Sequence, residues 1–425
     1  MEHLKKITFR FFFLYFMLTI TPWFWLTDIP GVSYVTGLYA QAMQWIVFRF
    51  NDWFLHVKDK LNVEGYGSGD TSYAWAEFYT IIILSLLIAI LWNVFDKKEK
   101  ESKSLSYWLH NLIRYNLIMV AFSYGIIKLF GLQMSFPNLS QLATPLGEFL
   151  PMRFSWMFIG YSQPYEFFSG VMEVIVGLML LYRRTIPLGL IVGLGVFINV
   201  FVMNMCYDIP VKLYAMQIVI CCLFLLAIDS RKYLNFFILN KATIPTTGYN
   251  YRFTKRWQRI GRIVLKTAFI VLTVGFTIYN CIDWYGQTHT LETSVIPQGV
   301  YNIKTFKKNN QIVAIDATDT LAWKDFIFDK AKLGSIKTAD TTFWNKYGRA
   351  YFIYETDKAK QMIHFKEGMS DTVPLFGMKY KFINKNTLQL EGVFKKDTLF
   401  YQLVRNDKKF PLAERQFHWI SEANR

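Results

Sequence analysis

Long apolar segments separated by short polar connections occupy the first two thirds of the chain, and a shorter alternation of apolar and polar residues follows. Seven segments approach the ~20 residues that a helix with a rise of about 1.5 Å per residue needs to cross a bilayer. The sequence therefore predicts about seven transmembrane helices. They cover Phe9 to Leu26, Trp75 to Phe95, Asn111 to Phe130, Tyr165 to Tyr182, Ile186 to Met205, Val211 to Ile228 and Ile263 to Ile282.

The apolar segments stop near Tyr285, and short strand-like segments joined by polar turns begin at Gly299. Examples are GVYNIKTF, QIVAIDA, GRAYFIYET, QMIHF, KYKFI, LQLEGVF and TLFYQLVR. Strands of this length with short connections predict an antiparallel meander that closes into a small β-barrel or sandwich. The expected fold is a multi-pass α-helical membrane protein with a C-terminal, lipocalin-like β domain.

The basic residues are concentrated in alternate connections between the apolar segments. If the N-terminus is cytoplasmic, eighteen Lys and Arg fall on the inner side and only Arg49, Lys58, Lys60 and Arg153 on the outer side before the last helix. Cytoplasmic connections are enriched in Lys and Arg. The sequence thus predicts an inner-membrane protein whose C-terminal domain is periplasmic or otherwise extracytoplasmic, and its net charge of +16 indicates topology rather than nucleic-acid binding.

The first outer connection contains the apolar segment GVSYVTGLYAQAMQWIVFRF, which Tyr34, Gln41, Gln44 and Arg49 interrupt. We expect it to lie in the membrane interface as an amphipathic helix. A crossing here would invert every later segment and move the basic clusters outside.

The four cysteines, Cys206, Cys221, Cys222 and Cys281, lie in or at the ends of apolar segments. They form no CxxC motif and no His accompanies them at metal-ligand spacing, so we predict no metal site. Cys206 is expected to be a small packed residue, with a redox thiol or a disulfide to Cys281 as alternatives.

Polar residues inside the predicted helices mark candidate functional positions, because each costs roughly 2.5 to 3.5 kcal/mol in a bilayer. Lys128 and Tyr124 share a face near the outer end of the third helix. Glu173 lies mid-helix in the fourth, and Asn199 and Gln217 fall at comparable depth in the fifth and sixth. We expect Glu173 and Lys128 to carry the chemistry, with the others as ligand contacts. The alternatives are that Lys128 snorkels to the headgroups and that Asn199 and Gln217 only join helices.

The fifth helix ends in NVFVMNMCYDIPVKL, which places several polar side chains close together. We take Asn204, Tyr207, Asp208 and Lys212 as ligand-binding candidates. Asp208 and Lys212 can alternatively form a simple structural ion pair across the turn.

The stretch from Arg114 to Asp229 is similar to the DoxX family of four-helix membrane proteins. The resemblance is carried by Gly125 and Lys128 of FSYGIIKLFG, by Glu173 and Gly177 of FSGVMEVIVGLMLL, by the following Arg pair, and by the NMCYDIPVKL stretch. It implies a DoxX-like bundle over residues 111–230. The remaining predicted parts are N-terminal helices over 1–110, a basic cytoplasmic loop with the last helix over 231–285, and the β domain over 286–425.

Some members of this family are linked to quinone reduction and thiol redox chemistry. The resemblance therefore implies a quinone-linked redox accessory subunit in which Glu173 and Lys128 exchange a proton with the quinone. We identify no other cofactor. A partner protein would have to supply the electrons. The alternative is a non-catalytic lipid- or isoprenoid-binding assembly protein that docks an envelope partner through the β domain. A transporter is a third possibility, disfavoured because no internal repeat is visible.

Overall fold

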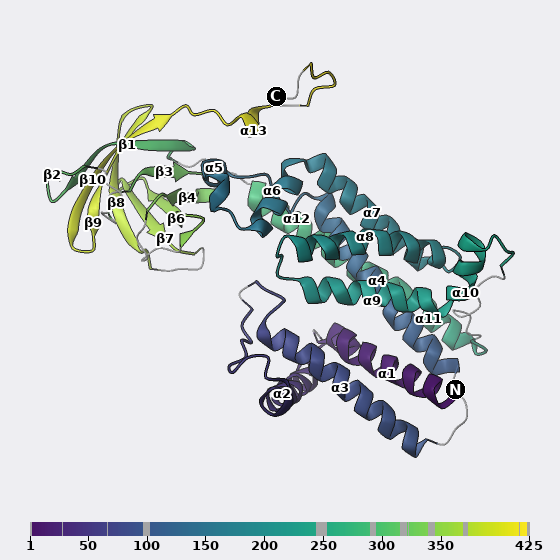
Figure 1. Cartoon of the computed structure of the whole chain (residues 1–425). Helices are drawn as coiled ribbons and strands as arrows, with labels where there is room; N and C mark the ends of the chain where they lie inside the picture. The colour runs from purple at the N-terminus through teal and green to yellow at the C-terminus, as the bar shows by residue number, and fades with distance from the viewer. Residues whose placement is uncertain are drawn as a thin grey trace. The chain divides into compact units, whose positions relative to one another are not determined.

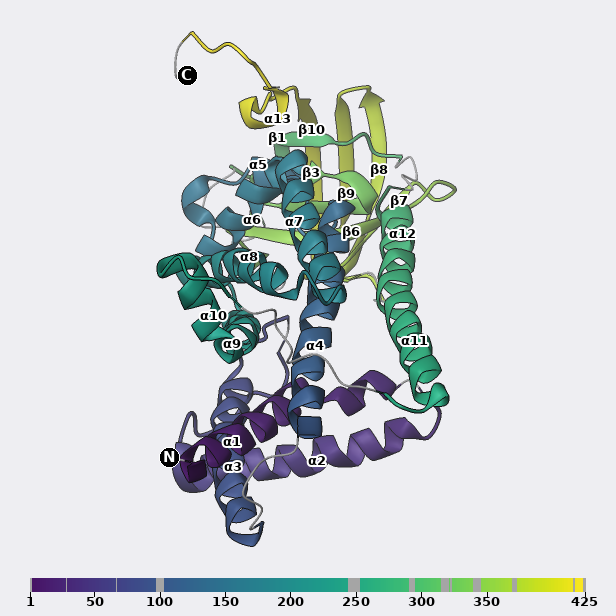
Figure 2. The ribbon, with the colours of Figure 1, turned by 90° about the vertical axis from the view of Figure 1, so that its right-hand side faces the viewer.

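The chain folds into two compact units, seen in a computed structural model (Figures 1 and 2). The structure describes residues 2–27, 29–65, 67–96, 103–243, 253–289, 295–314, 321, 323–338, 345–368, 373–415 and 417–422. The first unit comprises Met1–Gln133 and Pro164–Cys281, and the second comprises Met134–Gln163 and Ile282–Arg425. Each unit is therefore built from two separate stretches of the sequence.

The first unit is all helical. Its α-helices are α1 (Glu2–Ile20), α2 (Val32–Phe50), α3 (Ser72–Phe95), α4 (Lys103–Leu129), α7 (Gln163–Leu181), α8 (Ile186–Cys206), α9 (Lys212–Ile228), α10 (Ser230–Tyr233), α11 (Arg256–Ile270) and the first part of α12 (Phe276–His289), which continues into the second unit. Short 3-10 or π segments adjoin four of them, namely η1 (Pro22–Leu26), η2 (Asn51–Leu55), η4 (Leu234–Ile238) and η5 (Val271–Gly275). The last of these joins α11 to α12, so that the two form one long span.

Among the described residues, six helices are long and apolar enough to cross a membrane, or seven if the bent pair Lys212–Ile228 and Ser230–Ile238 forms one span. They coincide with the seven predicted segments. The predicted interfacial segment is also helical, as α2, and it is not among these six. The helices thus lie where the sequence placed them.

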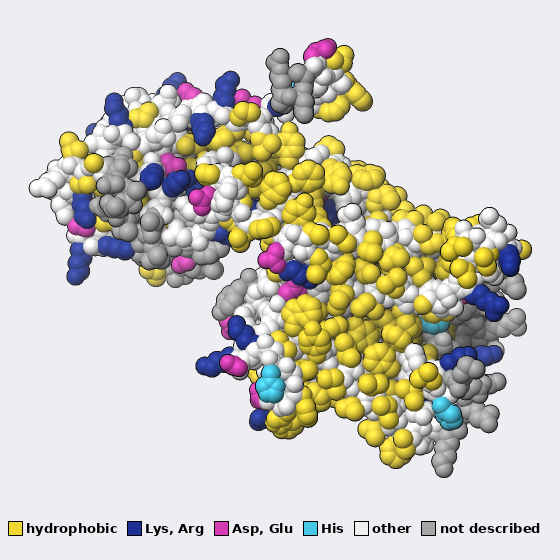
Figure 3. Space-filling view, viewed as in Figure 1, with side chains coloured by type: hydrophobic (Ala, Val, Ile, Leu, Met, Phe, Trp, Pro, Cys, Tyr) yellow, Lys and Arg dark blue, Asp and Glu magenta, His cyan; other side chains and the backbone are white. Residues whose placement is uncertain are grey.

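Large apolar side chains remain on the surface of the helical unit. Leu91 on α3, Phe168 on α7 and Leu265 on α11 are 56%, 58% and 72% exposed. In Figure 3, hydrophobic side chains cover most of the visible face of these helices, and charged side chains gather toward their ends. A soluble protein rarely exposes so continuous an apolar surface.

The C-terminal strands form a closed antiparallel barrel. The strands are β1 (Gly299–Lys308), β2 (Gln311–Ile312), β3 (Asp325–Phe328), β4 (Leu333–Ile336), β5 (Asn345–Lys346), β6 (Arg349–Asp357), β7 (Met362–Lys366), β8 (Phe376–Asn384), β9 (Thr387–Phe394) and β10 (Asp397–Asn406). Eight of them pair in the order β10-β9-β8-β7-β6-β4-β3-β1, and pairing of β1 with β10 closes the ring. The predicted choice between barrel and sandwich is therefore resolved as a barrel.

The barrel interior is a packed aromatic core. Trp323 is fully buried and stacks on Tyr401 with ring centroids 5.0 Å apart, and Phe365 stacks on Phe376 at 4.5 Å. Strand alternation directs Tyr401, Phe365 and Phe376 inward, and Trp323 lies just before β3. Three strands, β3, β4 and β5, were absent from the sequence prediction because they are only two to four residues long. Within the described part of the predicted strand QIVAIDA, residues 311–314, the structure has β2, which pairs with β1 outside the ring.

Residues 134–163 pack onto this barrel as part of the same unit. They contain α5 (Leu139–Leu142), η3 (Leu146–Glu148) and α6 (Pro151–Tyr161). The Asp329 carboxylate accepts the backbone N–H of Leu139 at 2.7 Å, and the Ser335 hydroxyl donates to Ser140 Oγ at 2.7 Å. The short helix α13 (Pro411–Glu414) follows the last strand.

Candidate functional site

Two glycines allow α4 and α7 to approach each other closely. A Cβ atom on Gly170 would lie only 2.7 Å from the Gly125 carbonyl oxygen and 2.9 Å from Lys128 Cβ. Two turns further along α7, a Cβ on Gly177 would lie 3.2 Å from the Phe122 ring. Small residues at this spacing bring helix backbones together in apolar surroundings. The glycines Gly125 and Gly177, which the resemblance singled out, therefore lie in this tight interface.

The candidate pair Lys128 and Glu173 meets in this interface. Lys128 Nζ donates to Glu173 Oε1 at 2.5 Å, and both side chains are buried, at 8% and 2% exposed. Lys128 therefore points to the bundle interior, and the alternative that it snorkels outward does not describe the structure. A buried ion pair of this kind is a strong interaction only while both partners remain.

One oxygen of this carboxylate has no hydrogen-bond partner within the described part of the chain. Among the described residues, no group donates to Glu173 Oε2, although that atom is buried. An ionised carboxylate accepts hydrogen bonds at both oxygens, and leaving one unmade in a buried site is costly. Glu173 Oε2 is thus an open acceptor position for a ligand hydroxyl or a water molecule.

Two partly exposed tyrosines lie near the pair. Lys128 Nζ lies 5.8 Å from the centre of the Tyr124 ring, which lies 6.2 Å from the ring of Tyr214 on α9. Tyr124 is 36% exposed and Tyr214 is 41% exposed. Tyr124 was a predicted ligand contact, and Tyr214 was missed because a tyrosine near a helix end is typical of an interfacial anchor.

The expected polar layer of Glu173, Asn199 and Gln217 differs from what the structure shows. Among the described residues Glu173 hydrogen-bonds only Lys128, while Asn199 is exposed on α8 and Gln217 is half-buried on α9. The buried face of α8 runs through Gly193 and Phe197, and Asn199 lies roughly 200° around the helix from Phe197 at 3.6 residues per turn. Asn199 therefore projects from a different side of α8 than the predicted polar layer requires.

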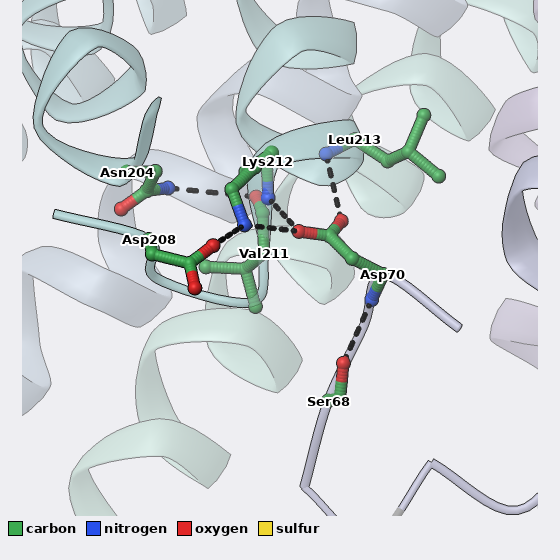
Figure 4. Close-up of polar contacts among 7 residues, drawn as sticks. All are labelled: Ser68, Asp70, Asn204, Asp208, Val211, Lys212 and Leu213. Atoms are coloured by element: carbon green, nitrogen blue, oxygen red, sulfur yellow. Dashed lines mark hydrogen bonds and ion pairs between the residues drawn. The ribbon is translucent and has the colours of Figure 1, made fainter. Parts of the chain in front are cut away.

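A second polar cluster forms where α8 turns into α9 (Figure 4). Lys212 Nζ donates to Asp208 Oδ1 at 2.7 Å and lies 3.7 Å from Asp70 Oδ2. The Asp70 carboxylate also accepts the backbone N–H groups of Lys212 at 2.8 Å and of Leu213 at 3.0 Å. The Asp208–Lys212 pair that the sequence suggested is therefore formed, and Asp70 anchors it as an additional partner.

The other residues of this turn have structural contacts. Buried Asn204 donates to the Val211 carbonyl at 3.4 Å, and Asp208 adopts a left-handed backbone with φ 50°. Tyr207 is 38% exposed. These contacts shape the turn, and ligand binding by Asn204, Tyr207, Asp208 and Lys212 stays a prediction.

Asp70 and Arg10 are buried polar residues that sequence reasoning missed as interaction centres. Arg10 is fully buried, donates to Asp96 Oδ2 at 2.6 Å and lies 4.7 Å from the Trp92 ring centre. Asp70 lies in an ordinary polar connection, and Arg10 was interpreted only as a topology signal. No sequence pattern marks either contact, because the partners are 142 and 86 residues away.

The four cysteines are free thiols. Cys206 is exposed rather than packed, which corrects the expectation, and the alternative disulfide with Cys281 is not formed. Across the described part of the chain, no three His, Cys, Asp or Glu side chains group as a metal site would require.

Comparison with known proteins gives one partial likeness. The chain is 36% identical over 83 residues to the uncharacterized protein YwoB of Bacillus subtilis (strain 168). That match covers 20% of this chain and 54% of the relative, so the chain spans about half the length of the curated relative it matches. No family model matches the chain, and no solved structure matches it. The DoxX resemblance therefore stays a prediction.

Proposed function

We propose that this chain is a DoxX-like integral membrane protein that binds the polar head of a membrane quinone at Lys128 and Glu173. The six or seven long apolar helices and the exposed apolar surface of the helical unit support placement in a bilayer. The basic connections favour a cytoplasmic N-terminus in the inner membrane and an extracytoplasmic barrel. The chain would thus act as an accessory subunit of a redox system.

The observation that carries this proposal is the open acceptor at Glu173 Oε2. A hydroquinone hydroxyl is a donor that can complete this carboxylate, and the adjoining Tyr124 and Tyr214 rings suit a flat aromatic head. Buried polar groups inside a membrane bundle commonly mark ligand or proton pathways. The apolar tail of a quinone would remain among lipid chains.

The same pair can supply a proton during quinone reduction. Conversion of a quinone to a hydroquinone takes up two electrons and two protons. Lys128 can donate one proton to a reduced quinone oxygen and recover it from the aqueous side, while the second proton comes from solvent. We assign the two electrons to a partner protein that carries a flavin or an iron centre. The chain itself supplies binding and proton transfer.

The test is quinone retention by the purified protein. The wild type, extracted into mild detergent, should carry a quinone that mass spectrometry of an organic extract detects, and Glu173→Gln should lower the retained amount at least tenfold. Glu173→Gln keeps the shape of the side chain but removes the charge. Glu77→Gln on α3 is the matched control, because Glu77 is also a partly buried carboxylate in an apolar helix.

The proposal fails if the wild type carries no quinone, or if Glu173→Gln and Glu77→Gln retain as much as the wild type. Both variants must be recovered at wild-type abundance for the comparison. If Glu173→Gln alone is poorly recovered, Tyr124→Leu provides the second variant, because Tyr124 is partly exposed. Full retention by Tyr124→Leu would likewise contradict the quinone site.

The second candidate function is a non-catalytic lipid- or isoprenoid-binding assembly protein. The observation that favours it is the closed barrel with its filled aromatic interior, which offers a rigid outer surface rather than an internal binding cavity. Such a domain is suited to docking an envelope protein. Retention of a lipid in place of a quinone in the same extract would support this alternative.

A further inference from the structure

A large cavity lies within the helical unit, away from the Lys128–Glu173 pair. It measures about 510 Å³ and opens between α4 and α11, with contributions from Leu181 and Arg183 at the end of α7. This volume is in the range of ligand sites for small molecules. None of the functional candidates from the sequence lies on its walls, and the lining residues Arg114, Arg183 and Arg262 were counted only as topology signals.

The charges that line this cavity all have one sign. Its walls include Arg114, Arg183, Arg262 and Lys266, and among the described lining residues there is no Asp or Glu. Lys266 Nζ donates to the Leu181 carbonyl at 2.9 Å, and Arg114, Arg183 and Arg262 are near enough to act on it electrostatically. Like charges in a partly apolar site repel one another strongly. A bound anion would offset this repulsion.

The rest of the cavity wall is aromatic. Tyr115 and Phe269 stack edge to face with ring centroids 5.0 Å apart, and Trp108 and Trp257 also line the space. The Arg114 guanidinium lies 4.9 Å from the Tyr115 ring centre. Cations beside aromatic faces are well placed for an amphiphile that carries both charge and apolar carbon. The walls therefore match an anionic head and a hydrocarbon tail together.

One face of α11 provides much of this wall. The lining positions Trp257, Gly261, Leu265 and Phe269 recur at intervals of four residues, and Arg262 and Lys266 lie beside them. A Cβ placed on Gly261 would have no other atom within 4 Å, so the space at this glycine is open. This face of α11 thus presents cations and aromatic rings to the same cavity, a combination that suits a ligand with both a charged and an apolar part.

We propose that this cavity is a binding site for one anionic phospholipid. The phosphate lies among Arg114, Arg183, Arg262 and Lys266, and an acyl chain follows the aromatic wall. Basic pockets between transmembrane helices bind phosphate headgroups in this way. Arginine and lysine are both suited to phosphate, with arginine adding paired hydrogen bonds. A free phosphate ion shares the charge but leaves the aromatic wall unused.

The first test measures the melting temperature of the delipidated full-length protein in neutral detergent. Phosphatidylglycerol should raise the melting temperature by several degrees, while phosphatidylcholine and inorganic phosphate should not. Arg262→Gln/Lys266→Gln should abolish that rise. Arg256→Gln/Arg259→Gln is the matched control, because it removes two cations from the same helix at positions that do not line the cavity, and it should keep the rise.

The second test fills the cavity without touching a charge. Gly261→Leu should fold normally, since the site is open, and native mass spectrometry should find at least tenfold less co-purified phospholipid on it than on the wild type. Gly275→Leu is the control, because that glycine also has open surroundings but lies outside the cavity. Wild-type lipid content in Gly261→Leu would overturn the proposal.

Two further results would contradict it. Equal loss of the melting-temperature rise in both double variants would mean that the lipid responds to the overall positive charge of α11 and not to the cavity. Full stabilisation by inorganic phosphate alone would mean that the site binds a soluble anion. Both outcomes are independent of quinone binding, because the residues changed do not contact Glu173.

Discussion

Asp70 and Lys212 are joined twice, once through the backbone and once through the side chain. Asp70 Oδ2 accepts the Lys212 N–H at 2.8 Å and lies 3.7 Å from its ammonium group. A carboxylate at the first turn of a helix satisfies free amide groups and favours the positive end of the helix dipole. This contact ties the connection between α2 and α3 to the start of α9.

Removal of the Asp70 carboxylate should weaken the helical unit. Asp70→Ala leaves two N–H groups at the start of α9 without an acceptor. We expect the free energy of unfolding to fall by about 1 to 2 kcal/mol. Thermal unfolding in detergent measures the change. Asp59→Ala, an exposed position in the same connection, is the control and should be neutral. Equal melting temperatures for both variants would refute the capping role.

The glycine contact between α4 and α7 should not tolerate a methyl group. Gly170→Ala places a Cβ 2.7 Å from the Gly125 oxygen, so the helices must separate. We expect a destabilisation of about 1 to 3 kcal/mol. Gly195→Ala on α8, where a Cβ meets no atom within 4 Å, should be neutral or stabilising by about 0.5 to 1 kcal/mol. Thermal unfolding distinguishes the two, and a neutral Gly170→Ala would contradict the close packing.

The buried Lys128–Glu173 pair should behave as a coupled unit. Lys128→Met and Glu173→Gln each leave one buried partner unpaired. Each should lower the free energy of unfolding by about 3 to 5 kcal/mol. The double variant should cost much less than the sum, because no unpaired charge remains. A double-mutant cycle measures this coupling. The Lys366–Glu355 pair is the reference, because its carboxylate is 53% exposed, and its coupling should not exceed about 1 kcal/mol. Similar coupling in both pairs would disprove the distinction.

Asp329 should hold residues 134–163 on the barrel. Asp329→Ala removes the acceptor for the Leu139 N–H. We expect the free energy that holds residues 134–163 on the barrel to fall by about 1 to 3 kcal/mol, so that the segment detaches more often. Trypsin should then cut after Arg153 roughly ten times faster than in the wild type. Asp357→Ala is the control, because Asp357 accepts hydrogen bonds only within its own turn, from Ala359 and Lys360. An unchanged rate in Asp329→Ala would rule out this anchoring.

Cys206 should be the reactive thiol of the folded chain and yet be dispensable. It is exposed, whereas Cys221 and Cys222 are 3% and 1% exposed. A maleimide should attach about one label per chain, and Cys206→Ala should remove it without lowering abundance or quinone retention. Loss of quinone retention at normal abundance would instead indicate thiol chemistry.

The sequence predicted the helices and the ion pair well because both follow from the cost of polar groups in an apolar environment. Seven apolar segments match the helices, and Lys128 and Glu173 stood out as costly charges inside two of them. The barrel was expected from strand alternation, although its closure depends on pairing of β1 with β10, roughly 100 residues apart, which no local pattern reveals.

Other features could not be read from the sequence for physical reasons. Helix α8 is apolar on all sides, so no periodicity shows which face is buried, and Asn199 was assigned to the wrong side. Asp70 and Arg10 make contacts that only the fold brings together. Residues 134–163 contain short helices with little periodic signal, and their place on the barrel depends on single hydrogen bonds such as Asp329 to Leu139.

The origin of the second unit from two distant stretches has a consequence for biosynthesis. Ser140 leaves the ribosome 195 residues before its hydrogen-bond partner Ser335. At about 5 to 20 residues per second, this partner arrives about 10 to 40 s later. During that interval, residues 134–163 have been made but the barrel has not, so this segment lacks its packing partner and must avoid aggregation. Truncation of the gene before the barrel would leave residues 134–163 permanently without this packing partner.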